Sequence, residues 1–110
     1  MAMRTIGYVN ITTAGTRVRV TVGETDPTAR IPCHTIFFQA HPSNTGVIYV
    51  GNSAVSSSAG LFATLPIPTN NIHPTFELGL AQSPNAFNLV DFYVDASVNG
   101  DDVLVSYLTM

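Results

Sequence analysis

Charge is scarce in this chain, and lysine is absent from it. Among the 110 residues, 10% are charged and 45% are hydrophobic. An average soluble domain carries about a quarter charged residues, and a small domain must leave much of its apolar area at the surface. We therefore expect part of the surface to face another protein, in an assembly with several copies of the chain.

A basic surface, a disulfide framework and long apolar runs are also missing. The net charge is −3 and the four arginines form no run, which argues against nucleic-acid binding by phosphate neutralisation. The single cysteine, Cys33, has no partner for an intrachain disulfide, and the N-terminus lacks the apolar region of a secretion signal. No apolar run approaches the ~20 residues that cross a bilayer. We expect a soluble protein made in a reducing cytoplasm, with no membrane partner.

Helical periodicity is absent, because apolar residues nowhere recur at helical spacing over three turns. Short alternating runs separated by turn residues recur instead, at intervals typical of sandwiches. The sequence therefore predicts an all-β, single-domain β-sandwich or jelly roll of about seven to eight strands. We place this domain at residues 16–110 and expect residues 1–15 to form an N-terminal contact segment.

Alternation locates the strands. We predict strands at Arg17–Val22, at Cys33–Gln39 with Ile36 and Phe38 on one face, and at 47–50, 61–65 and 76–80. The longest pattern runs from Phe87 to Val98. The pair Asn99-Gly100 separates it from a final run at 103–110, and this pair favours a tight turn, so we predict a terminal hairpin. Phe37 points away from the main core, either as a doubly buried strand residue or as an interface aromatic.

The residues that could carry chemistry do not assemble into a known site. His34, His41 and His73 lack the cupin pattern of two histidines one residue apart with a glutamate shortly after. Cys33 and His34 are adjacent on a strand and so point to opposite faces, which favours a buried structural cysteine.

Other candidate residues fit ordinary structural roles. The serines at 56–58 lack a glycine elbow and fit a solvated loop. The aspartates at 91, 95, 101 and 102 lack calcium-loop spacing and fit a solvated strand face. We expect no enzyme activity, no metal and no cofactor.

Two segments carry a resemblance to a known class of protein. They are Gln39–Gly51, with the sequence QAHPSNTGVIYVG, and Tyr93–Gly100, with the sequence YVDASVNG. These segments resemble small virion proteins of tailed bacteriophages and prophages, specifically capsid decoration or cement proteins. The similarity covers roughly residues 16–55 and 87–110 and rests mostly on strand and turn residues; segment 1–15 shows no pattern of that class.

The resemblance implies a jelly-roll subunit, commonly a homotrimer, that binds the major capsid protein on the outside of an assembled head and stabilises it. The expected location is then the capsid surface of a virion, after synthesis in the host cytoplasm. On this interpretation we expect the N-terminal segment and the sheet-edge loops to make the intersubunit contacts. The candidate contact residues are Arg4, Ile6, Tyr8, Phe37 and Tyr49.

A second function from another class stays open. Tyr49 and Tyr93 could stack on sugar rings in a receptor- or carbohydrate-binding module of a tail or head fibre, or they could be ordinary sheet residues.

Overall fold

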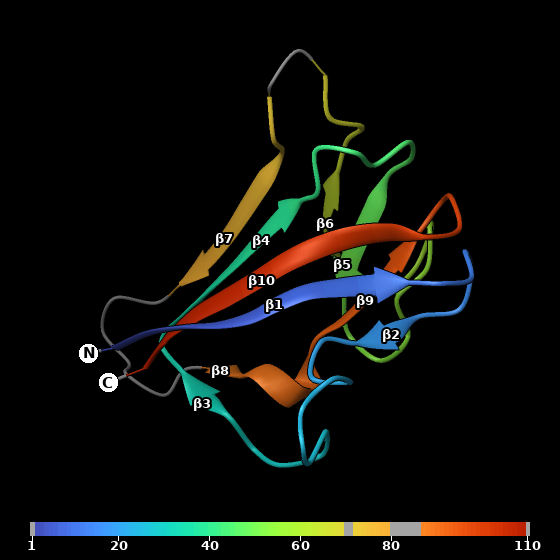
Figure 1. The fold of residues 1–110 in the computed structure, drawn as a ribbon. Helices are drawn as coiled ribbons and strands as arrows, with labels where there is room; N and C mark the ends of the chain where they lie inside the picture. Colours follow the sequence, from blue (N-terminus) through green and yellow to red (C-terminus); the bar gives the residue numbers. More distant parts are fainter. Residues whose placement is uncertain (1, 70–71, 80–86, 110) are drawn as a thin grey trace.

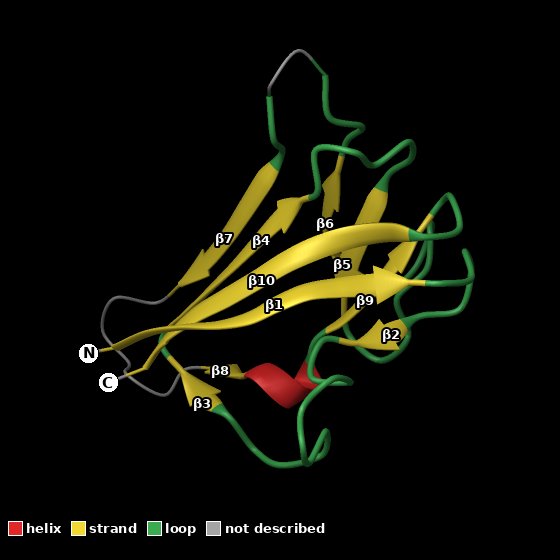
Figure 2. Cartoon of the chain, viewed as in Figure 1, coloured by secondary structure: helices red, strands yellow, loops and turns green. Residues whose placement is uncertain are grey.

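The structure is a computed structural model that describes residues 2–69, 72–79 and 87–109 (Figure 1). Strands dominate these residues, with one 3-10 turn, η1, at Leu89–Asp91 (Figure 2). The strands are β1 (Ala2–Ile11), β2 (Val18–Arg19), β3 (Pro32–Cys33), β4 (Thr35–Ala40), β5 (Ile48–Gly51), β6 (Leu61–Leu65), β7 (Thr75–Gly79), β8 (Phe87–Asn88), β9 (Tyr93–Ala96) and β10 (Asp101–Thr109).

Eight of these strands build two antiparallel sheets. Sheet A has the order β1-β10-β4-β7, sheet B has the order β2-β9-β5-β6, and β3 pairs with β8 in a separate ladder. When β3 and β8 are set aside and the other eight strands are renumbered along the chain, the orders become 1-8-3-6 and 2-7-4-5. Successive strands thus mostly change sheet, as in a jelly roll. The predicted all-β sandwich is confirmed, and the described residues form ten strands rather than seven or eight.

The core lies between the two sheets. Ile36 and Phe38 of β4 are fully buried, as their predicted shared face requires, and they meet the inner side chains of β5, β9 and β10. In β10 every second residue from Val103 to Tyr107 is buried, and the residues between them are partly exposed. Alternation of this kind is expected where a sheet has one face on the core.

The predicted strand at Arg17–Val22 is shorter than expected. Only Val18 and Arg19 pair with β9, and the chain then turns, because the Val22 N–H donates to the Arg19 carbonyl at 3.0 Å. The Thr21 hydroxyl donates to the Pro27 carbonyl at 2.6 Å and closes this turn on the segment that follows. As a result Val22 is 54% exposed instead of facing the core.

The predicted strand at Phe87–Val98 is interrupted. Asn88 ends β8 and caps η1, because its side-chain oxygen accepts the N–H groups of Ile31 at 2.9 Å and Val90 at 3.4 Å. The 3-10 turn then buries Leu89, and β9 begins only at Tyr93. The side-chain bond from Asn88 is a local competitor to strand pairing that alternation does not register.

The predicted terminal hairpin is wrong in its pairing. A turn is present and Gly100 has φ of 86°, as the Asn-Gly pair favours, but β9 lies in sheet B and β10 in sheet A. The Gly100 N–H donates to the Ile11 carbonyl at 2.8 Å, so the turn is attached to the end of β1. The loop at 41–46 likewise joins β4 to a strand of the other sheet.

The N-terminal segment belongs to the sandwich. Residues 2–11 form β1, an edge strand of sheet A paired along its length with β10 (Figure 1). A bulge between Thr5 and Gly7 interrupts the register, and Gly7 has φ of 92°, a conformation that favours glycine. The expected boundary at residue 16 is therefore not a structural boundary. In the described part of the chain, no helix is long and apolar enough to span a bilayer.

Candidate docking surface

The outward side of sheet A carries a group of apolar side chains, which we call the sheet-A face. Pairing puts Met3 opposite Leu108 and Tyr8 opposite Leu104, and Phe37 lies opposite Ser106 on the other side of β10. Met3 is 62% exposed and Tyr8 is 55% exposed, while the other three apolar residues are partly exposed. The face is thus an apolar surface supported by a rigid sheet.

Tyr8 is held at its place on this face by a neighbouring ring. Its ring centre lies 4.8 Å from that of His41, with the two planes tilted by 59°. His41 is itself anchored, because its Nδ1 accepts the N–H of Ser43 at 3.0 Å. A side chain that is both exposed and positioned loses less conformational entropy when a partner covers it.

Charged side chains on the sheet-A face lie near its margins. Asp102 stands at the start of β10 and accepts a hydrogen bond from the Asn10 side-chain amide at 2.7 Å. Glu77 lies on the opposite edge strand, β7, across from Phe37. Between them the polar groups are neutral, including Thr5, Ser106 and Gln39. Burying such a surface costs less desolvation than burying a charged one.

The five predicted contact residues are not all brought together. Tyr8 and Phe37 share the sheet-A face. Arg4 lies opposite Tyr107, whose side chain points to the core, and Ile6 stands at the bulge of β1 and packs against the core. Tyr49 lies on β5, in the other sheet. Sequence reasoning missed Met3, Leu104 and Leu108. The alternation of the last strand puts Leu104 and Leu108 on the same face, but the run is apolar on both faces and does not indicate which one points outward.

Cys33 is a free, fully buried cysteine, as predicted. Burial raises the pKa of its thiol to about 11. Burial also raises the pKa of Tyr107, an effect that the positive charge of Arg4 opposes. His34 contacts the hydroxyl of Thr35 through Nδ1 at 2.6 Å. Among the described residues, no three histidine, cysteine or acidic side chains converge as they would around a metal ion.

Two aspartates that we expected on a solvated face are buried instead. Asp95 is 2% exposed and accepts the N–H groups of Gly15 at 3.0 Å and Ala96 at 2.8 Å. Asp101 is 5% exposed and accepts those of Thr45 at 3.2 Å and Gly46 at 2.9 Å. Both carboxylates therefore hold loops against strands, a role that needs long-range contacts and gives no signal in the local sequence.

No family model matches the chain, and comparison with curated proteins and with solved structures finds no significant match.

Proposed function

We propose that this protein is a structural subunit of a bacteriophage virion that binds the outer surface of the capsid and stabilises the head. The observation that carries the proposal is the sheet-A face, with Met3 62% exposed and Tyr8 55% exposed on a sheet whose nearby polar groups are mostly neutral. The resemblance of residues 39–51 and 93–100 to decoration proteins supports the same role. The partner is the major capsid protein, and the protein acts by burying surface, without a chemical step.

Burial of the sheet-A face supplies enough binding free energy for stable attachment when the contact is repeated over the capsid. Full burial of a methionine or a large apolar side chain contributes about 1.5–3 kcal/mol, so two or three such residues offset much of the cost of association. A head offers many equivalent sites, and an oligomer that engages several of them gains further through effective concentration. We propose a homotrimer as that oligomer, located on the capsid surface.

Co-sedimentation with purified heads that lack this protein tests the proposal. The wild-type chain should bind heads saturably, and the double variant Met3→Asp/Tyr8→Asp should bind at least tenfold more weakly, because burying two carboxylates against protein is unfavourable. The matched control is Val22→Asp, since Val22 is 54% exposed and lies on the turn after β2. Failure of the wild-type chain to bind, or equal binding by the double variant, would contradict the proposal.

A further inference from the structure

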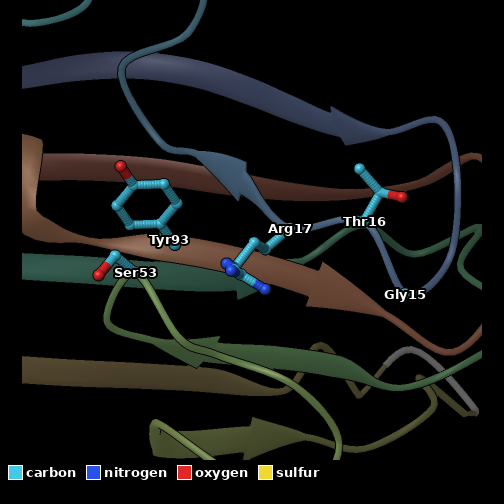
Figure 3. A pocket seen from close by; sticks show the side chains of 5 residues that line it. All are labelled: Gly15, Thr16, Arg17, Ser53 and Tyr93. Carbon is cyan, nitrogen blue, oxygen red and sulfur yellow. The ribbon is translucent and has the colours of Figure 1, made fainter.

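The outward side of sheet B carries a shallow, open hollow, which we call the sheet-B groove and which is separate from the sheet-A face. It consists of two cavities that share Gly15 in their lining. The first, of about 530 Å³, is lined by Gly15, Thr16, Arg17, Ser53 and Tyr93 (Figure 3). The second, of about 390 Å³, is lined by Tyr49, two serines of the 51–60 loop and residues of β9. Both volumes fall in the range of small-ligand sites.

Two tyrosines form the floor of this groove. In the pairing of β5 with β9, Tyr49 lies opposite Asp95 and Tyr93 lies opposite Gly51, so the two tyrosines project from the same side of the sheet. They are diagonal neighbours on adjacent strands, an arrangement in which the two Cα atoms lie about 7–8 Å apart. Figure 3 shows the Tyr93 ring face-on, with the side chain of Arg17 extending toward it.

Arg19 fixes the orientation of the Tyr93 ring. Its Nε donates to the Tyr93 hydroxyl at 2.9 Å and a second guanidinium nitrogen donates at 2.5 Å. The guanidinium carbon lies 5.2 Å from the ring centre. Because both nitrogens bond the hydroxyl oxygen, the guanidinium sits at that end of the ring. The ring is therefore positioned before any ligand arrives, which lowers the entropic cost of stacking on it.

The walls of the groove are rich in hydroxyl groups and carry a positive charge. Thr16 and Ser53 line one cavity, and Ser56 and Ser57 line the other. Arg17 is exposed in the first cavity. The acidic group in the second cavity is Asp95, whose carboxylate is buried and already accepts the N–H of Gly15, which holds the 12–17 loop against the sheet.

We propose that this groove binds an acidic oligosaccharide. Sugar rings would stack their apolar C–H faces on Tyr49 and Tyr93, their hydroxyls would bond the threonine and serine side chains, and a sugar carboxylate would pair with Arg17. A single-stranded nucleic acid could also stack on aromatics, but it needs several cations along its backbone, whereas Arg17 is the arginine in the cavity lining and Arg19 is already bonded to the Tyr93 hydroxyl. The site goes beyond capsid binding, because it needs no residue of the sheet-A face.

An array of immobilised bacterial polysaccharide fragments tests this site, with neutral, uronate-bearing and sialate-bearing members. The wild-type chain should bind uronate- or sialate-bearing members more strongly than neutral ones. Tyr49→Ala and Tyr93→Ala should each weaken binding at least tenfold, and Arg17→Gln should remove the preference for acidic members. Tyr8→Ala is the matched control, since it removes an exposed tyrosine of sheet A and should leave glycan binding unchanged. Tyr93→Phe keeps the ring if Tyr93→Ala fails to fold, and should retain most of the binding.

Three results would overturn the proposed site: no binding to any member of the array, preference for neutral members, or equal binding by the folded Tyr49→Ala variant. The failure of this proposal is distinguishable from failure of capsid binding. Met3→Asp/Tyr8→Asp should weaken binding to heads and leave the glycan array unaffected, whereas Tyr49→Ala should do the reverse.

Discussion

At the scale of single residues, two buried carboxylates position the loops of this sandwich. Asp101 accepts two backbone N–H groups of the 41–46 loop, at 3.2 and 2.9 Å. Replacing it by alanine leaves both donors without their acceptor, so we expect Asp101→Ala to lower the free energy of unfolding by about 3 kcal/mol. Urea unfolding measures this change. Asp91→Ala removes an exposed carboxylate and should change stability by less than about 0.5 kcal/mol; equal losses in the two variants would contradict the assignment.

The thiol of Cys33 gives a second prediction at this scale. Because the side chain is fully buried and its pKa is about 11, the reactive thiolate is scarce and shielded at pH 8. Alkylation by iodoacetamide should therefore be at least a hundredfold slower in the native protein than in urea, followed by mass spectrometry. The raised pKa of the Cys33 thiol also makes the stability of the protein depend on pH. The unfolded chain loses the thiol proton near pH 9, before the folded chain does, so this group lowers stability as the pH rises from about 9 to about 11. Stoichiometric native labelling within minutes would contradict the burial of Cys33.

At the scale of elements, the missing side chain of Gly51 lets β5 pack closely against the end of the 51–60 loop. A Cβ on Gly51 would lie 1.9 Å from the carbonyl oxygen of Gly60, which is backbone and cannot move aside cheaply. Gly51→Ala should therefore separate β5 from the end of the 51–60 loop and lower the melting temperature by at least 10 °C, as measured by circular dichroism. Gly23→Ala is the control, because a Cβ there meets nothing within 4 Å. A melting temperature unchanged in Gly51→Ala would mean that this junction is looser than described.

The position of β10 leads to a prediction on local stability. It lies between β1 and β4, so its N–H groups are bonded on both sides, whereas β7 is an edge strand of the same sheet. Amides of Val103 and Val105 should exchange with deuterium at the rate of global unfolding, and amides of β7 should exchange earlier. Protection in β7 equal to that in β10 would contradict the sheet order.

The strands also show which features of the fold the sequence could predict. Alternation identified the core face of β4, because Ile36 and Phe38 fall on the same side of the strand and both are fully buried. In β10 the run is apolar on both sides, so alternation alone did not identify its core face. It did not identify the sheet to which a strand belongs. Asn99-Gly100 determines a tight turn, but the strand after it pairs with β1 and β4, and these partners are remote in sequence. The break after Asn88 depends in part on a bond from Ile31, 57 residues away, and the local sequence did not indicate it.

At the scale of the whole molecule, the sandwich presents two unlike surfaces on opposite sheets. The sheet-A face is apolar, and the sheet-B groove combines tyrosines, hydroxyls and one exposed arginine. Sequence reasoning named Tyr8, Phe37, Tyr49 and Tyr93 as candidates, because exposed aromatics in a chain with few charges stand out. It could not assign them to a sheet, and it could not find the groove wall, which depends on the bond from Gly15 to Asp95, 80 residues apart.

Hydroxyl-radical footprinting of the head-bound protein shows which sheet docks on the capsid, because the radical oxidises exposed methionine and tyrosine side chains. We expect oxidation of Met3 and Tyr8 to fall at least fivefold on binding to heads, while oxidation of Tyr49 and Tyr93 stays as in the free protein. Protection of Tyr49 and Tyr93 with Met3 and Tyr8 unchanged would contradict docking through the sheet-A face, since the protein would then dock through sheet B.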